Sequence, residues 1–273
     1  MGRIKNTWSL AKVSWAVLRQ DRELLLIPVL SFVSALVVLG ALLIPTIALL
    51  DTGSAEESSN PALVVLGIVA ALAMSIISVF FNGALVAGAH ERMSGGDPTV
   101  GSAMRRATAR LGGLLPWALL TGTVGLVLQA VRERAGFIGS FIVNLAGAAW
   151  EVVTFLVVPA IVIDDHSAVD GLKRSGALLK ATWGENLAAR VGFGLLGLLA
   201  MIPAVVLVAV MSALGSAALV VGVGVAVIYV AVVIVVLTAL NAVFQTALYL
   251  YATTGSVPSG YEHSNLPESF TRK

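Results

Sequence analysis

The sequence contains no cysteine and few charged residues. Only 12% of its 273 residues are Asp, Glu, Lys or Arg, whereas a soluble domain carries about 25%. The lack of cysteine excludes a disulfide framework and a thiolate metal site. Hydrophobic residues reach 58% and the mean hydropathy is +0.95, so too little polar surface remains to face water all round. These totals indicate a chain that lies in a lipid bilayer.

The sequence also lacks the short motifs of common enzyme classes. It has no G-x-S-x-G nucleophile elbow, no P-loop and no H-E-x-x-H zinc motif. Gly192, Gly194 and Gly197 lie inside an apolar run, where small residues allow close helix contact. We therefore expect no catalytic residues, no metal site and no cofactor.

Six apolar runs are long enough to cross a bilayer, which takes about 20 residues as a helix. The runs are continuous rather than alternating, which favours helices over barrel strands. We predict an all-α membrane protein with about six transmembrane helices in three hairpins, each associated with a basic amphipathic helix at the membrane surface. The predicted spans are 24–50, 62–89, 111–131, 137–163, 191–214 and 217–251.

The predicted spans form a single domain, residues 1–251, followed by a flexible cytoplasmic tail, residues 252–273. Residues 1–22 do not resemble a secretory signal peptide, because their charges are spread throughout and no cleavage site follows. The sixth span is overlong, and its Gly222 and Gly224 either mark a bend or allow close packing. Pro159 lies near the end of the fourth span, where we expect water to replace the backbone hydrogen bond that proline removes.

Lysine and arginine lie almost entirely on one side of the predicted spans. Of the 17 in the chain, only Arg132 and Arg134 fall on the opposite side. The positive-inside rule therefore places both termini in the cytoplasm.

A basic amphipathic segment precedes each predicted hairpin. In residues 7–18, Trp8, Ala11, Trp15 and Leu18 recur at the spacing of one helix face. Residues 99–110 and 168–190 have the same position before the next two hairpins. Such helices lie in the membrane interface and contact anionic headgroups. The predicted lipid contacts are Trp8, Lys12, Trp15, Arg105, Arg106, Lys173, Lys180 and Trp183.

Glu151 is an acidic residue deep in the fourth predicted span. A charge there costs at least about 2.5–3.5 kcal/mol, so a partner, a cavity or a proton must compensate it. One interpretation is a proton or cation site in a transport path. The other is a hydrogen bond between packed helices, or a span shifted so that Glu151 lies nearer water.

Further polar residues recur at helical spacing within the spans. Ser75, Ser78 and Asn82 do so in the second span, as do Thr238, Asn241 and Gln245 in the sixth. Interhelical hydrogen bonds of this kind are usually structural, but these residues could also line a polar cleft with Glu151. The predicted intramembrane polar site comprises Glu151, Asn144, Asn82, Asn241 and Gln245.

Two short clusters of ionisable residues end the second and fourth spans. They are His90-Glu91-Arg92 and Asp164-Asp165-His166. Carboxylates with histidine can bind a divalent metal or transfer protons, but the ligand spacing of a metal site is missing. Solvated helix ends are the simpler interpretation.

One group of residues lies in 150–185 and comprises Trp150, Thr154, Phe155, Pro159, Lys173-Arg174-Ser175, Lys180 and Thr182-Trp183-Gly184-Glu185, to which Phe80-Phe81-Asn82 and Gly95-Gly96-Asp97-Pro98-Thr99 add. In these residues the chain resembles an uncharacterised bacterial and archaeal six-span membrane family, domain of unknown function 6159. A looser similarity reaches the membrane domain attached to some glycerophosphodiester phosphodiesterases, whose catalytic barrel is absent here. The resemblance implies a multi-pass protein of a bacterial or archaeal cell membrane, and it transfers no activity.

Two functions follow from these observations. The first is a non-enzymatic integral membrane protein that acts as a scaffold or as a module that interacts with lipids or partner proteins. The alternative is a small-solute or proton-coupled transporter that uses Glu151. An enzyme at the surface formed by His90 and Asp164 is a third and weaker reading. The expected partners are the lipid bilayer with its anionic headgroups and another membrane protein or a second copy of the chain, with no nucleic acid.

Overall fold

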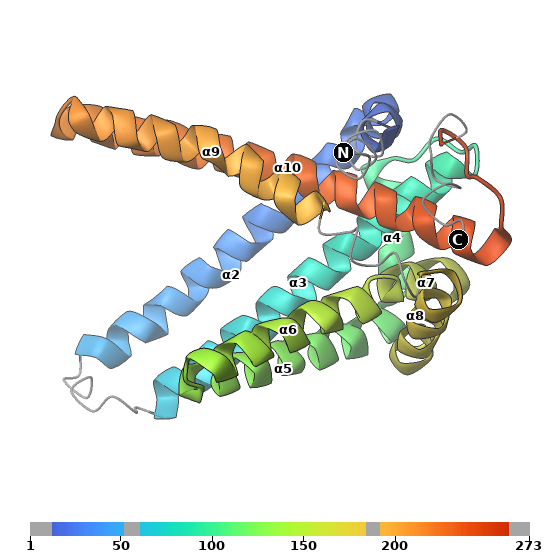
Figure 1. Ribbon diagram of the computed structural model, residues 1–273, viewed down its shortest axis with the longest axis horizontal. Helices are drawn as coiled ribbons and strands as arrows, with labels where there is room; N and C mark the ends of the chain where they lie inside the picture. The colour runs from blue at the N-terminus through green and yellow to red at the C-terminus, as the bar shows by residue number, and fades with distance from the viewer. Residues whose placement is uncertain (1–12, 52–60, 184–191, 262–273) are drawn as a thin grey trace.

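The computed structural model describes residues 13–51, 61–183 and 192–261 (Figure 1), and within these ranges it contains helices and no strand. Residues 13–20 form a short helix. The elements that follow are η1 (Arg22–Leu25), α2 (Leu26–Asp51), α3 (Pro61–Met93), α4 (Val100–Ala109), α5 (Leu111–Arg134), α6 (Phe137–Thr154), α7 (Val157–Asp164), α8 (Ala168–Trp183), α9 (Gly192–Ala213) and α10 (Ser216–Thr254).

Five segments are long and apolar enough to cross a membrane. They are Arg22–Leu49, Pro61–Met93, Leu111–Arg134, Phe137–Asp164 and Ser216–Thr254. A shorter apolar stretch, Gly197–Ala213 in α9, packs along α10 as the other arm of a hairpin. The predicted all-α membrane fold is therefore confirmed, with α2–α3, α5–α6 and α9–α10 as its helix pairs.

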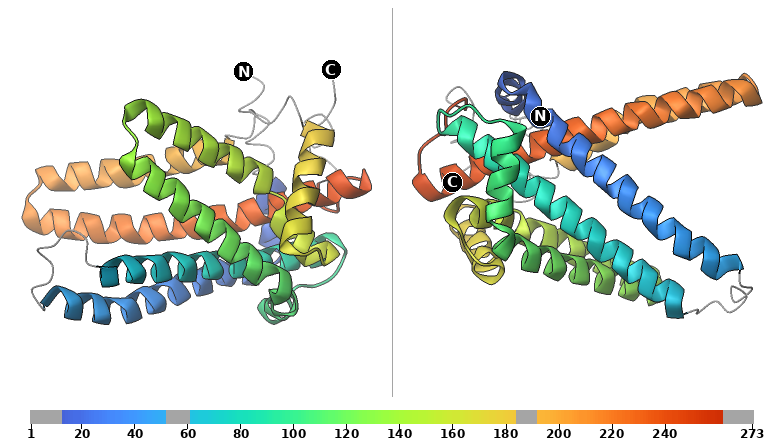
Figure 2. Two further views of the ribbon diagram at one scale, coloured as in Figure 1. Left: turned by 90° about the horizontal axis from the view of Figure 1, so that it is seen from below. Right: turned by 180° about the vertical axis from the view of Figure 1, so that it is seen from behind.

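Helix α3 is the centre of the structure, because it contacts α2, α4, α5, α7 and α10. The three hairpins converge at one end of the molecule and diverge toward their tips (Figures 1 and 2). Helix 13–20, α4, α7 and α8 lie at the convergent end. We call it the basic end, because it carries the exposed side chains of Arg19, Arg22, Arg105, Lys173, Arg174 and Lys180.

Polar contacts hold the hairpins together at the basic end. Asp21, which is 7% exposed at the start of the first hairpin, forms an ion pair with Arg92 near the end of α3. Arg110, between α4 and α5, pairs with Asp165, which ends α7 in a left-handed conformation with φ of 60°. Because these pairs join segments far apart in sequence, they fix how the short helices sit on α3.

The fourth span differs from the single helix we predicted, because it is interrupted between α6 and α7. Ser175 of α8, which is fully buried, supplies two hydrogen bonds at the interruption. Its hydroxyl donates to the Val153 carbonyl at 2.6 Å and accepts from the Leu156 amide at 3.1 Å. One side chain thus satisfies two backbone groups that the broken helix leaves unpaired.

Pro159 accounts for a third unpaired group. Proline has no N–H, so the carbonyl of Phe155, four residues earlier, lacks its helical donor. The side-chain amide of Gln245 in α10 donates to that carbonyl. Our expectation that water would take this role was wrong, because α10 packs against α7 at this point and brings a side-chain donor.

Residues 252–261 also differ from the flexible tail we predicted. Helix α10 continues to Thr254, and Tyr261 is fully buried, with its hydroxyl 2.6 Å from that of Ser14 in helix 13–20. Burial raises the pKa of the Tyr261 phenol, and the hydrogen bond with Ser14 acts in the opposite direction. Residues 255–261 therefore pack against helix 13–20. Residues 262–273 lie outside the described residues.

Helix α10 runs through all 39 of its residues without a break. A Cβ atom at Gly222 would lie 2.6 Å from Met211 of α9, whereas one at Gly224 would meet no atom within 4 Å. We left open whether these glycines mark a bend or allow close packing, and Gly222 allows close packing against α9. At Gly224 there is room for a larger side chain.

We predict that Ser175→Ala lowers the free energy of unfolding by about 1–3 kcal/mol, because it leaves the Leu156 amide and the Val153 carbonyl unpaired in a buried site. Thermal unfolding of the full chain in detergent measures the change. Ser212→Ala is the control, since Ser212 is exposed on α9 and bonds to its own helix. Equal midpoint temperatures for the two variants would contradict the role of Ser175.

Candidate functional site

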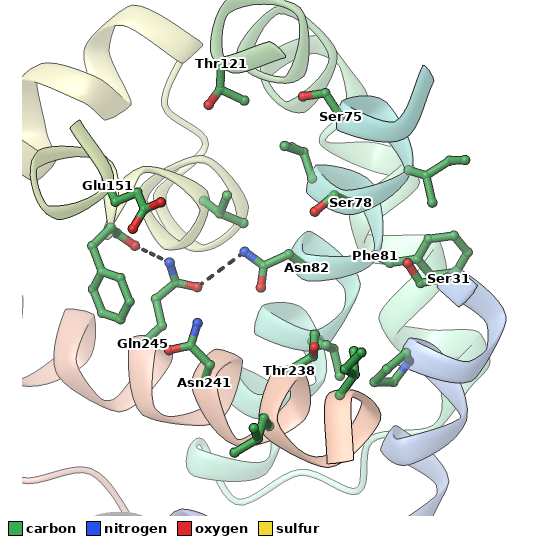
Figure 3. A pocket seen from close by; sticks show the side chains of 18 of the residues that line it. Ser31, Ser75, Ser78, Phe81, Asn82, Thr121, Glu151, Thr238, Asn241 and Gln245 are labelled. Atoms are coloured by element: carbon green, nitrogen blue, oxygen red, sulfur yellow. Dashed lines mark hydrogen bonds between the residues drawn. The ribbon is translucent and has the colours of Figure 1, made fainter. Parts of the chain in front are cut away.

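A cavity of about 1000 Å³ lies between the hairpins (Figure 3). All three hairpins contribute to its wall, through residues of α2 and α3, of α5 and α6, and of α10. Asn82, on the wall, lies 11 residues before the end of α3, or about 16 Å along a helix. Gln245 lies nine residues before the end of α10. These two amides are therefore inside the apolar spans, between their middle and the basic end.

Glu151 lines this cavity from the last turn of α6. Its side chain is exposed and points toward the amides of Asn82, Asn241 and Gln245 (Figure 3). No described lysine, arginine or histidine forms an ion pair with it. The carboxylate thus faces open space rather than a partner on another helix, which argues against a packing role for this side chain.

Asn82 and Gln245 join α3 to α10 below Glu151. The Asn82 Nδ2 donates to the Gln245 Oε1 at 3.4 Å, and the Gln245 Nε2 donates to the Phe155 carbonyl (Figure 3). Gln245 is 5% exposed, so this network forms the floor of the cavity. The same side chain that satisfies the interrupted helix therefore also shapes the site.

Hydroxyl groups extend the polar strip along the wall. Ser75 in α3 donates to the Ala118 carbonyl of α5 at 2.7 Å, and the Trp150 indole lies 3.5 Å from the Thr121 hydroxyl. Trp150 also stacks on Trp117, with ring centroids 6.1 Å apart. These contacts fix α5 and α6 against α3 and leave hydroxyls on the cavity surface.

The structure brings together four of the five residues of the predicted polar site. Glu151, Asn82, Asn241 and Gln245 all line the cavity, together with Ser75, Ser78 and Thr238. Asn144 does not line it, and its side chain is exposed two turns nearer the hairpin tip. The physical reason is that α6 packs against α5 and α8 rather than α10, so the wall does not continue that far.

Several residues that line the cavity were not predicted from the sequence, among them Ser31, Trp117 and Thr121. A signal for the hydroxyl residues was present, because Ser31 and Ser34 recur at helical spacing in the first predicted span and Thr121 lies within the third. Polar residues inside a span do not by themselves show which helix they face. Only the packing of α2 and α5 on α3 brings them to the site.

The lining can hold an apolar body and orient a polar group. Most of its residues are hydrophobic, and aromatic rings come from Phe32, Phe81, Trp117, Phe155 and Phe244. Within the part of the chain that the structure describes, Glu151 is the one charged residue of the lining, which contains no lysine, arginine or histidine. No group of three or more potential metal ligands occurs among the described residues.

The predicted lipid-contacting residues occupy different environments. Arg105, Lys173 and Lys180 are exposed at the basic end, and Arg106 is half-buried. In helix 13–20, Trp15 is 37% exposed, but Leu18 is 1% exposed and belongs to the core. These two residues therefore do not share one membrane-facing surface as the spacing predicted, because Leu18 packs inward with Ser14 and Val17. Trp8, Lys12 and the side chain of Trp183 lie outside what the structure describes.

The two ionisable clusters lie at the basic end. The Tyr249 hydroxyl of α10 donates to the Asp164 carboxylate, so this acid links α7 to α10. His90 lies near Arg106 and Asp164, and its buried Nδ1 has no partner among the described residues. Asp165 is engaged by Arg110. The carboxylates of the second cluster are thus occupied in contacts between helices.

A known protein family matches most of the chain. The sequence model of a family of unknown function (DUF6159) matches residues 61–260, more than half of the 273 residues. The chain therefore belongs to this family, which confirms the resemblance seen in residues 150–185. No curated protein matches the chain.

We predict that the effects of Asn82→Leu and Gln245→Leu on the free energy of unfolding are not additive, because each substitution removes one side of the hydrogen bond between α3 and α10. Interhelical hydrogen bonds in membrane proteins contribute about 0.6 kcal/mol on average, and a double-mutant cycle isolates that contribution. Gln245→Leu alone lowers the free energy of unfolding further, by about 1–3 kcal/mol, because the Phe155 carbonyl loses its donor.

Unfolding of both single variants and the double variant in detergent measures these energies. Gln129→Leu is the control, because Gln129 is exposed on α5 and bonds only to Glu133 among the described residues. Strict additivity of the two cavity substitutions, or a Gln245→Leu effect no larger than that of the control, would contradict the network.

Proposed function

We propose that this member of the family of unknown function (DUF6159) is a non-enzymatic integral membrane protein that binds a small membrane-soluble molecule between its hairpins. The observation that carries the proposal is the cavity of about 1000 Å³ inside the spans. Ligand sites are typically about 300–1,000 Å³, mostly apolar, with a few convergent polar groups. The cavity wall has this composition, with Glu151 and the amides on one side. This proposal gives a specific form to the lipid-interacting module that we expected from the missing catalytic motifs and the basic interfacial segments.

The arrangement of the helices supports entry from the bilayer. Helix α6 packs against α5 and α8, and α10 packs against α9 and α3. Glu151 on α6 and Gln245 on α10 both line the cavity, and α6 and α10 are not among the helix pairs with extensive contact. A membrane-soluble molecule can reach the site between these two hairpins.

The composition of the wall supports binding without chemistry. A serine or threonine nucleophile needs an adjacent general base to activate it. Among the described residues, the cavity lining contains no histidine or lysine, and Glu151 is its one acid. Amides and hydroxyls in an apolar wall orient a ligand through hydrogen bonds, which is the role we assign to them.

A small-solute or proton-coupled transporter is the second candidate, favoured by one specific observation. A lone intramembrane acid lines the cavity directly beside an interrupted helix. Acids within spans and discontinuous helices are common at the binding sites of transporters. Binding is common to both candidates, and transport adds a movement of the hairpins that carries the ligand across.

We further propose that the basic end faces the cytoplasm of a bacterial or archaeal cell and contacts anionic headgroups. The exposed Arg105, Lys173, Arg174 and Lys180 support this orientation. Lysine and arginine are retained on the cytoplasmic side, and each gains about 1 kcal/mol near an anionic leaflet.

Blocking the cavity tests the proposed binding. We predict that Ser78→Trp reduces the amount of ligand that the protein retains from a polar lipid extract by about tenfold, because the indole fills space beside the polar strip. Native mass spectrometry of the full chain measures retained ligand. Ser212→Trp adds the same side chain to an exposed position on α9 and is expected to retain as much as the unmodified chain. Equal retention by both variants would refute binding in this cavity.

Labelling of single cysteines tests the orientation, since the chain has no cysteine of its own. Ala109→Cys lies in α4 at the basic end, and Gly136→Cys lies at the tip of the α5–α6 hairpin; both positions are exposed. In intact cells, a membrane-impermeant maleimide is expected to label position 136 and to reach position 109 only after lysis. Labelling of position 109 alone in intact cells would invert the topology.

A further inference from the structure

We propose that the molecule bound in the cavity is an organic cation, an amine or quaternary ammonium compound with an apolar body, whose charge pairs with Glu151. This inference rests on the proposed function and names the class of ligand. It follows from the charge, the unused hydrogen-bonding groups and the aromatic rings of the cavity wall.

The wall of the cavity carries an unpaired negative charge. Among the described residues, Glu151 is the one charged member of the lining, and no lysine, arginine or histidine pairs with it. An isolated carboxylate within a membrane is costly, and it needs a counter-charge, a proton or water. A cationic ligand supplies that counter-charge. A phosphate headgroup would instead meet a carboxylate and no lysine, arginine or histidine from the lining.

Some polar groups of the lining are free to bind a ligand, and others are already hydrogen-bonded within the protein. Gln245 is occupied, because its oxygen accepts from Asn82 and its nitrogen donates to the Phe155 carbonyl. The Asn241 side chain makes no hydrogen bond with another described residue, and it points into the same space as Glu151 (Figure 3). Glu151 and Asn241 are therefore two of the lining groups that a ligand can engage, one through a carboxylate and one through a neutral amide.

Aromatic side chains form part of the remaining wall. Phe32, Trp117 and Phe155 place aromatic rings around the cavity that holds Glu151. Aromatic faces attract organic cations and line the sites that recognise quaternary ammonium groups. The cavity is also far larger than an inorganic ion requires. Because a hard metal ion prefers several oxygen ligands at short distance, a bulky organic cation suits this wall better.

Two probes of similar size and opposite charge test the ligand class. The probes are tetraphenylphosphonium, a cation, and tetraphenylborate, an anion. Their binding is measured by equilibrium dialysis against the full chain in phosphatidylcholine nanodiscs, with empty nanodiscs to correct for partition into lipid. We expect saturable binding of the cation and none of the anion beyond that to empty discs.

Substitution of Glu151 locates the charge that is recognised. Glu151→Gln is expected to weaken cation binding at least about tenfold, because a desolvated charge loses its partner. Glu151→Asp, which keeps the charge, is expected to restore much of the affinity. Glu133→Gln makes the same charge change at an exposed position of α5 outside the cavity and is expected to leave binding unchanged. Thermal unfolding of each variant checks that it is folded.

The outcomes separate the two levels of the proposal. Equal binding of the cation to the Glu151→Gln and unmodified proteins, or anion binding as tight as cation binding, overturns the cation class. If Ser78→Trp still abolishes the binding in that case, the cavity stands as a site for a ligand of another class. Cation binding that survives Ser78→Trp overturns the cavity itself as the site, and with it the proposed function.

Discussion

The structure depends on one constraint of the bilayer, which is that every backbone amide and carbonyl must find its partner within the protein. The interruption between α6 and α7 exposes three such groups, on Val153, Phe155 and Leu156. Ser175 of α8 and Gln245 of α10 satisfy them. Since these two side chains come from different helices, satisfying the interruption also sets the positions of α8 and α10 around it. The floor of the cavity is a consequence of this arrangement.

The basic end and the hairpin tips play different parts in this architecture. At the basic end, ion pairs such as Asp21 with Arg92 and Arg110 with Asp165 hold the short helices on α3. The hairpins diverge toward their tips (Figure 2), and most of the cavity wall is apolar with a polar strip along it. A site of this composition is suited to a molecule that has a polar head and an apolar body.

Much of the fold followed from the sequence, because a transmembrane helix needs a long continuous apolar run and such runs are visible without any partner. Helical spacing also identified Ser75, Ser78 and Asn82, which line the cavity with Glu151. The interruption of the fourth span was not predictable in the same way. Pro159 marks it, but the freed carbonyl lies four residues earlier and its donor is on α10. Periodicity within one helix does not show which helices pack together, so it grouped Asn144 with four residues that line the cavity without it, and it did not predict the burial of Tyr261.

The central claim is that the cavity beside Glu151 is a binding site for a membrane-soluble molecule. An electron cryomicroscopy map of the full chain, purified from its native membrane into nanodiscs, tests it most directly. We predict non-protein density between the side chains of Glu151 and Asn241, and we expect it to continue into density for an apolar body between α6 and α10. A map in which α6 and α10 pack together and their side chains fill this space would contradict it.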